Sequence, residues 1–201
     1  MTSAVLPFTS YRNKDMTYNE FTDSEILLEA YSYLSEVTPL KFDCGKLCGA
    51  RCCGGNAGPD EEENMGMWLL PGEKELLDGE EGFAFAKNES GTDCLVCSGK
   101  CDRDFRPFAC RIYPYYASLK QLPEGRIMIK IKPDPRAFIS CPLVSPYAVR
   151  KYRPSAGFVK SAVRATRLLL SRPAFRSELL EISSFLGELE DMRKKFFDSN
   201  K

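Results

Sequence analysis

The chain has 201 residues, of which 43% are hydrophobic and 28% are charged, and this composition excludes a wholly disordered or collagen-like chain. Its formal net charge is zero, although positions 17 to 93 hold 17 acidic and 5 basic residues whereas positions 135 to 177 hold 9 basic residues and no acid. The chain has nine cysteines and no histidine, and the lack of histidine excludes Ser/His and Cys/His catalytic pairs, mixed Cys/His zinc fingers and facial-triad iron sites.

The first helix signal begins at residue 22. Residues 22–25 read Thr-Asp-Ser-Glu, which fits a capping box. Apolar residues then recur on one face of the expected helix at Ile26, Ala30, Leu34 and Val37. The pattern predicts a half-buried helix that leads into the first cysteines.

Short strands and a hairpin are expected in the middle of the chain. Residues 67–70 and 82–86 predict short strands, and a helix is expected over residues 73–77, directly after Pro71-Gly72. Residues 112–119 and 126–132 flank a Pro-Glu-Gly turn, and isoleucine alternates with other residues in the second run. We therefore expect a β-hairpin with one buried face.

The last third of the chain predicts two helices. Ser155 can cap the first, and Pro173 begins the second. The apolar face of the second helix is expected to contain Phe175, Leu179, Ile182, Leu186, Leu189 and Phe196. The two helices predict a C-terminal helical hairpin over residues 155–197 that packs on the rest of a single domain, 1–201. The expected fold class is α+β, with a small cysteine-rich metal-binding core, a β-hairpin, an N-terminal helix and this helical hairpin.

The opposite charges of the two halves admit two interpretations. Either a basic layer complements an acidic layer within the molecule, or the basic tract 150–176 faces an anionic partner. Lys160, Arg164 and Arg167 are expected on one outward stripe of the first C-terminal helix. Nucleic acid is the less favoured anionic partner, because aromatic residues do not alternate with this stripe as a stacking platform requires.

The compartment bears on how the cysteines are interpreted. No apolar run is long enough to span a membrane, and the first residues lack the basic and apolar segments of a secretory signal. We therefore expect a cytoplasmic protein without membrane association. In a reducing compartment, many cysteines more often indicate metal ligation or redox chemistry than disulfides.

The cysteines form two groups. The first group is Cys44, Cys48, Cys52 and Cys53, the second is Cys94, Cys97, Cys101 and Cys110, and Cys141 follows alone. Thiolates two or three residues apart can converge on one ion where the chain turns tightly, whereas inert core thiols have no reason to bunch in this way. A zinc ion or a cubane iron–sulfur cluster takes four thiolates, so nine cysteines can fill two sites and leave one over. Cys141 is either a distant ligand or a core thiol.

Two arginines beside the second group are candidates for charge compensation. Four thiolates on a zinc ion or an oxidised cluster leave a net negative charge that must be offset when water is excluded. Arg106 and Arg111 lie next to Cys110 in the sequence. We expect their guanidinium groups to lie near the sulfurs and to stabilise the thiolate forms.

Residues 106–114 read Arg-Pro-Phe-Ala-Cys-Arg-Ile-Tyr-Pro and follow the adjacent pair Cys52 and Cys53. This combination resembles the YkgJ-type cysteine-cluster family, described as a zinc- or iron-chelating domain, whose pattern is CxxCxxCC followed by RPxxCRxYP. The resemblance implies a metal-binding core over residues 42–142. It matches the first group of cysteines, Cys101 and Cys110 around the Arg-Pro motif, the late Cys141, and either Cys97 or Cys94 in the middle position. The first group has three-residue spacers where the family usually has two, so the individual ligands stay open.

The sequence therefore favours a cytosolic protein that holds zinc or an iron–sulfur cluster through cysteine thiolates. The spacing does not distinguish the two cofactors, because all-thiolate sites serve both. An iron–sulfur-dependent enzyme of redox or group-transfer chemistry is the first alternative, in which Tyr113, Tyr115 and Tyr116 are either acid/base groups or hairpin core. A zinc-knuckle module that binds nucleic acid is the second alternative.

Overall fold

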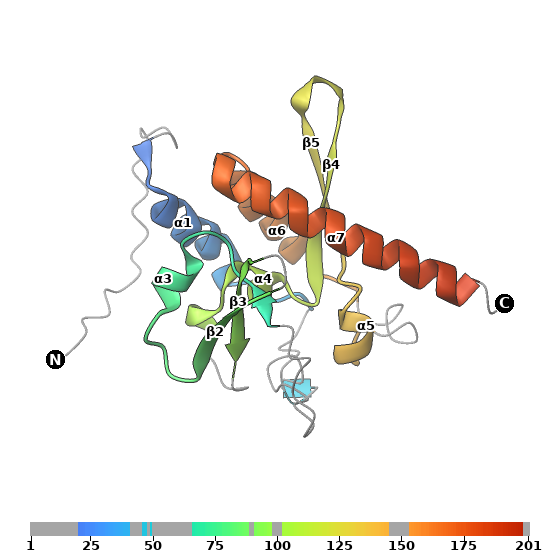
Figure 1. Cartoon of the computed structure of the whole chain (residues 1–201), viewed down its shortest axis with the longest axis horizontal. Helices are drawn as coiled ribbons and strands as arrows, with labels where there is room; N and C mark the ends of the chain where they lie inside the picture. Colours follow the sequence, from blue (N-terminus) through green and yellow to red (C-terminus); the bar gives the residue numbers. More distant parts are fainter. Residues whose placement is uncertain are drawn as a thin grey trace.

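The computed structural model describes residues 20–40, 46–47, 49, 66–88, 91–97, 102–144 and 153–198. The helices are α1 (Asp23–Ser35), α3 (Glu73–Leu77), α4 (Phe108–Ile112), α5 (Ala137–Ser140), α6 (Ala156–Leu169) and α7 (Pro173–Asp198), with 3₁₀ turns η3 (Arg103–Phe105) and η4 (Pro123–Gly125). The strands are β1 (Met67–Trp68), β2 (Phe83–Lys87), β3 (Asp93–Cys97), β4 (Tyr115–Gln121) and β5 (Ile127–Pro133). Helices combine with two small antiparallel sheets, of order β1-β3-β2 and β4-β5, which confirms the α+β class (Figure 1). No helix in the described ranges has both the length and the apolar character that a membrane span requires.

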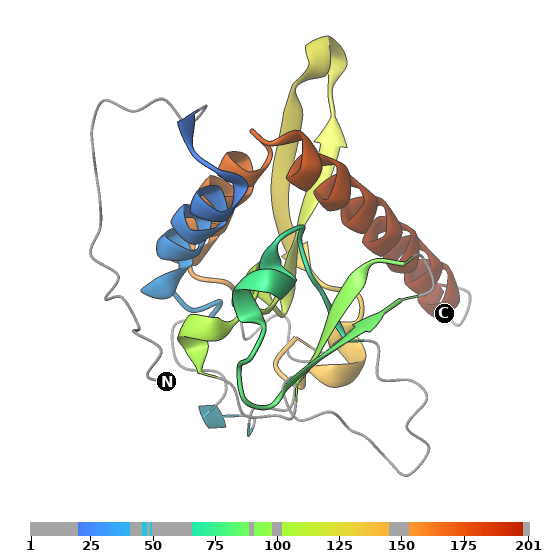
Figure 2. The ribbon, with the colours of Figure 1, turned by 60° about the vertical axis from the view of Figure 1, so that its left-hand side comes forward.

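The capping box predicted at residue 22 begins α1. The Thr22 hydroxyl accepts a hydrogen bond from the Glu25 N–H at 3.3 Å, and the Glu25 carboxylate accepts one from the Thr22 N–H at 2.7 Å. These bonds satisfy donors that the first turn of a helix otherwise leaves unpaired. The apolar face of α1 is fully buried and packs along α6 (Figure 2).

The predicted hairpin is present as β4 and β5, which pair in register from Tyr115 opposite Pro133 to Gln121 opposite Ile127. It begins three residues later than expected, because residues 108–112 form the short helix α4 instead. Phe108 and Ile112 are four residues apart, so one turn of helix buries both on the same side. Beyond its base the hairpin rises above the body of the molecule (Figure 1).

The two C-terminal helices do not form the expected hairpin of stacked helices. The helix α6, capped by Ser155 as predicted, lies against α1 and β5, whereas α7 lies against β4 (Figure 2). The strands of the hairpin therefore come between the helices. Each helix covers a different side of the hairpin. If the two helices were stacked on each other, one side of the hairpin would be exposed to water.

The predicted apolar face of α7 is buried only along its first half. Phe175, Leu179 and Leu186 are at most 5% exposed, whereas Phe196 is 74% exposed. The prediction that Phe196 belongs to the core is wrong. The helix is 26 residues long and extends past α5, so its last turns lie beyond the elements that could cover them (Figure 1).

Ser183 joins α7 to the hairpin, and its loss should weaken that contact. Its buried hydroxyl accepts a hydrogen bond from the Leu119 N–H at 2.7 Å. We expect Ser183→Ala to lower the free energy of unfolding by about 1–3 kcal/mol, because the Leu119 N–H would lose its acceptor. Urea denaturation measures this, with Ser184→Ala, an exposed neighbour, as the matched control. Equal stability of the two variants would contradict the assignment.

Candidate functional site

The structure places four of the nine cysteines. Cys94 and Cys97 lie on β3, Cys110 lies on α4, and Cys141 is the residue that ends α5. The other candidate ligands, Cys44, Cys48, Cys52, Cys53 and Cys101, lie outside the described residues.

The strand β3 contains Cys94 and Cys97, two members of the second cysteine group, and directs them to different sides. It pairs without a bulge from Asp93 to Cys97 against β2, and successive side chains of a strand point to opposite faces. Cys94 and Cys97 are three residues apart, so their side chains leave opposite faces of the sheet. Their spacing on a regular strand therefore does not bring the two sulfurs to one ion.

Each face of β3 has its own surroundings. Cys94 is 4% exposed and pairs with Trp68 of β1, and burial raises the pKa of its thiol. Leu95, on the same face as Cys97, packs in a small apolar cluster with Phe105, the residue directly before Arg106. Cys97 is half-buried at the end of the strand. The face that carries Cys97 is thus the one directed toward residues 106–114, which we call the Arg-Pro segment.

Cys110 and Cys141 occupy different positions relative to the core. Cys110 is half-buried on α4, between the buried Phe108 and Ile112, and lies close enough to Tyr31 to influence the pKa of that phenol. Cys141 is 6% exposed and belongs to the main apolar core. Among the described residues, no three cysteine, aspartate or glutamate side chains are grouped so that they could hold a metal ion.

Arg111 holds the Arg-Pro segment in its fold. Its Nε donates to the carbonyl oxygen of Arg106 at 2.6 Å, and its Nη2 donates to that of Asp104 at 2.6 Å. Its guanidinium carbon lies 4.2 Å from the ring centroid of Tyr31, and the side chain is only 7% exposed. These contacts direct Arg111 to backbone oxygens and an aromatic face, whereas the sequence predicted that it faces sulfur. Arg106 takes part in this arrangement through its carbonyl oxygen, which accepts the hydrogen bond from Arg111.

A buried carboxylate, Glu73, completes this arrangement. Its side chain is fully buried and accepts hydrogen bonds from the Tyr31 hydroxyl, from the Leu70 N–H at 2.7 Å and from the Phe108 N–H at 2.6 Å. Burial raises the pKa of Glu73, while these donors and the nearby Arg111 charge act in the opposite direction. The carboxylate therefore connects α1, α3 and the start of α4.

Glu73 and Tyr31 were not among the predicted site residues. Glu73 lies in an acidic stretch of the sequence where an exposed side chain is the ordinary expectation, and Tyr31 fits the apolar face of α1. No local signal distinguishes Glu73 from the exposed Glu75 two residues later. Two of its three donors, the Tyr31 hydroxyl and the Phe108 N–H, come from segments 42 and 35 residues away in the chain.

A buried ion pair lies next to Cys94. The Nε and Nη2 of Arg136 donate to the two carboxylate oxygens of Asp134 at 3.0 and 2.7 Å, and Asp134 is 1% exposed. The guanidinium also stacks 4.2 Å from the ring centroid of Trp68. Arg136 partly opposes the effect of burial on the pKa of Cys94. This pair joins β1 to the end of β5.

The basic tract is engaged within the molecule at several points. Arg164 stacks on Tyr33 of α1 with its guanidinium carbon 3.9 Å from the ring centroid, and Arg172 forms an ion pair with Asp23 at 3.5 Å. Lys160 and Arg167 are exposed on α6. The contacts of Arg164 and Arg172 fit the interpretation that the basic tract complements acidic and aromatic groups within the molecule. The exposed Lys160 and Arg167 fit the interpretation that it faces an anionic partner.

The three tyrosines weighed as acid/base groups are parts of the packing. Tyr115 and Tyr116 are each 3% exposed, and burial raises the pKa of Tyr116 to about 12. The Tyr113 and Ser140 hydroxyls form a hydrogen bond with each other. Their surroundings are those of core residues.

Comparison with known proteins identifies no relative, since no family model, no curated protein and no solved structure matches this chain.

Removal of the Glu73 carboxylate should destabilise the fold strongly. Glu73→Ala leaves the Tyr31 hydroxyl and the N–H groups of Leu70 and Phe108 without their acceptor, and removes one of the negative charges near Arg111. We expect a loss of about 3–5 kcal/mol in urea denaturation, because a buried charged network loses its centre. Glu75→Ala on the exposed side of α3 should change stability by no more than about 0.5 kcal/mol. Similar losses for both variants would refute the role given to Glu73.

Alkaline pH should destabilise the protein through Tyr31. Its folded-state pKa lies well above the usual value of 10, first because burial disfavours the phenolate and second because the Glu73 carboxylate repels it. The unfolded chain loses this proton near pH 10 while the folded chain retains it, so stability is full below that pH and falls as pH rises above it. Tyr31→Phe should lose about 1–3 kcal/mol at neutral pH but show a weaker decline above pH 10. Urea midpoints between about pH 8 and about pH 11 test this, and parallel pH profiles for the two proteins would contradict it.

Proposed function

We propose that this chain is a metal-binding protein that holds zinc or an iron–sulfur cluster through cysteine thiolates. The observation that carries the proposal is the spacing of the cysteines, with two groups of four and the last member of the second group inside an Arg-Pro segment. Thiolates are the ligands that both structural zinc and iron–sulfur clusters take. A chain without histidine has few other soft ligands to offer a metal.

The setting of Cys110 supports a ligand role for this residue. The N–H of Phe108, at the start of its helix, is bound to Glu73, and the side chain of Arg111, its neighbour, is bound to two carbonyl oxygens of the preceding turn. Cys110 thus lies on a short helix that is fixed on both sides. Ligands held in place by surrounding hydrogen bonds bind a metal with less loss of conformational entropy.

In this proposal Cys97 is a ligand and Cys94 is a core thiol. Cys97 lies at the end of β3 on the face of the Phe105 cluster, and Cys101 follows it by four positions in the sequence. Cys94 lies on the opposite face, buried beside Trp68 and the Arg136 guanidinium. A ligand set drawn from one side of β3 includes Cys97 and leaves Cys94 out.

Arg111 has a positioning role in this proposal. It is one residue from Cys110 and brings a positive charge to the segment, which favours the thiolate form of nearby cysteines. Its donors are bound to backbone oxygens, so its main effect is to fix the turn that carries Cys110. The contribution of Arg106 as a source of charge stays a prediction.

Anaerobic purification followed by metal analysis and absorption spectroscopy tests the proposal. Zinc at about one ion or more per chain in a colourless protein supports a zinc site. A visible charge-transfer band that bleaches with dithionite, together with iron and sulfide, supports a cluster. A folded chain that contains neither metal and takes up neither from solution would overturn the proposal.

Substitution of the two cysteines of β3 tests the ligand assignment. We expect Cys97→Ala to lower the metal content per chain or to weaken metal retention against a chelator by at least about tenfold, since one thiolate is lost. Cys94→Ala should retain the metal content of the unchanged chain, because the residue lies on the opposite face of the sheet. Inductively coupled plasma mass spectrometry gives the metal content, and circular dichroism controls for folding. Loss of metal in Cys94→Ala but not in Cys97→Ala would reverse the assignment.

A further inference from the structure

The second half of α7 carries an apolar stripe that the fold leaves exposed. Phe185, Met192 and Phe196 are 42%, 48% and 74% exposed, and Leu189 between them is half-buried. The four positions are separated by four, three and four residues, so they follow one side of the helix. This is the spacing of the contact positions of a coiled coil.

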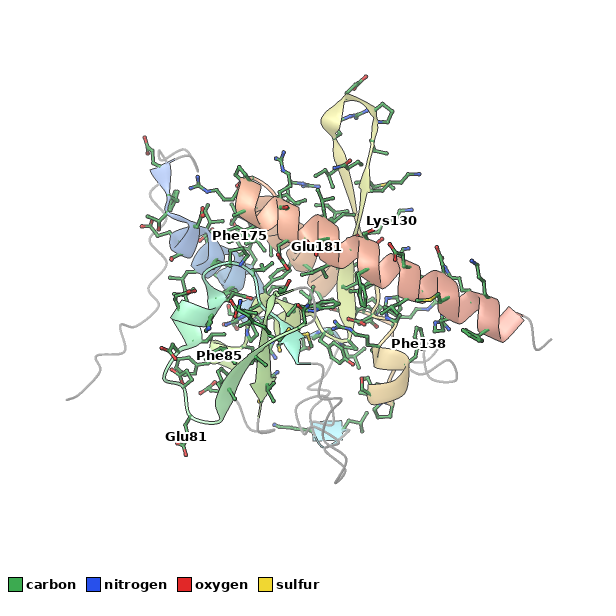
Figure 3. All side chains as sticks on the ribbon, viewed as in Figure 1. Glu81, Phe85, Lys130, Phe138, Phe175 and Glu181 are labelled. Carbon is green, nitrogen blue, oxygen red and sulfur yellow. The ribbon has the colours of Figure 1, made fainter. Side chains whose placement is uncertain are left out.

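The stripe differs from the side of α7 that packs on the protein. Leu179 and Leu186 face the core, and Leu186 is about 100° around the helix from Phe185. Phe185 packs edge-to-face with Trp68, with ring centroids 5.4 Å apart, and is still 42% exposed. Figures 1 and 3 show the C-terminal half of the helix running out above α5 and its residue Phe138. Aligned exposed aromatic and methionine side chains of this kind mark an interaction surface.

The charges beside the stripe indicate which partner fits it. Glu188 and Lys195 are exposed, are seven residues apart, and therefore flank the stripe on the same side. The acidic residue lies near one end of the stripe and the basic residue near the other. A second copy that runs in the opposite direction brings Glu188 of each copy beside Lys195 of the other, with Leu189 opposite Met192 and Phe185 opposite Phe196.

Antiparallel pairing explains more of the pattern than parallel pairing does. In a parallel pair, Glu188 would face the position of Arg193 on the second copy. The guanidinium of Arg193 lies 4.1 Å from the ring centroid of Phe138 of its own chain, on the side of α7 that faces the protein. Lys195 is exposed on the solvent side of the stripe, where a second helix can reach it.

We infer that the stripe from Phe185 to Phe196 pairs antiparallel with the same stripe of a second copy of this chain. The twelve residues span about 18 Å of helix, which is short for an interface. The dimer is therefore a weak one that forms as protein concentration rises. This inference uses no property of the cysteines, so it is independent of the metal-binding proposal.

Sedimentation velocity of the full chain over about a hundredfold range of concentration tests the inference. We expect a reversible monomer–dimer equilibrium, and we expect Met192→Glu to weaken it at least about a hundredfold, since two carboxylates would be buried near the centre of the contact. Circular dichroism confirms that the variant folds. Lys194→Gln, which changes an exposed α7 residue about 160° around the helix from Met192, should leave the dimer unchanged.

Charge exchange tests the direction of the helices. Glu188→Lys and Lys195→Glu should each weaken the dimer about threefold to tenfold, because two equivalent ion pairs become repulsive. An equal mixture of these two variants should restore association, since each copy then offers the charge that the other needs. A chain that stays monomeric at every concentration, a dimer insensitive to Met192→Glu, or a mixture that fails to recover would overturn the inference. Binding of the stripe to lipid vesicles without dimer formation would overturn it as well.

Discussion

The structure depends on one buried carboxylate, that of Glu73. A charge without water must be matched by donors, and here the donors come from the Tyr31 hydroxyl of α1, from the Leu70 N–H and from the Phe108 N–H. These groups are far apart in the sequence, so the carboxylate is satisfied only when the three segments meet. Burial of the carboxylate would be costly if any of these donors were missing. This cost makes the contact among the three segments specific. Glu73 thus fixes where the Arg-Pro segment begins relative to α1.

The arginines in and just before the Arg-Pro segment are bound to backbone oxygens. Arg111 binds the carbonyl oxygens of Arg106 and Asp104 and stacks on Tyr31, and Arg103 donates to carbonyl oxygens at the end of α1. The arginines therefore build the turn that carries Cys110, the residue that we propose as a ligand. A rigid turn of this kind suits a protein in which a metal is to be held by side chains from separate segments.

The hairpin organises the other half of the molecule. Because β4 and β5 form a sheet of only two strands, both sides need cover, and α6 and α7 are distributed between those sides. Ser183 of α7 binds the Leu119 backbone, which ties the longest helix to a strand and not to its neighbour helix. A helix of 26 residues against a hairpin of this size cannot be buried along its whole length. Its second half is therefore free to carry a surface with a different purpose, at Phe185, Met192 and Phe196.

Local patterns in the sequence determined much of the secondary structure: the Thr22 capping box, the turn between β4 and β5, the Ser155 cap and the start of α7 at Pro173 all lie where they were predicted. These features depend on residues within one or two turns of each other, which is why sequence alone reveals them. The cysteine spacing also predicts which residues could bind a metal, and this stays a prediction. Only the tertiary structure decided that Cys94 and Cys97 leave opposite faces of β3, that Arg111 faces backbone oxygens, and that Phe196 lies outside the core. The physical reason is that burial and pairing depend on segments that are distant in the chain, and no local pattern records which of them will meet.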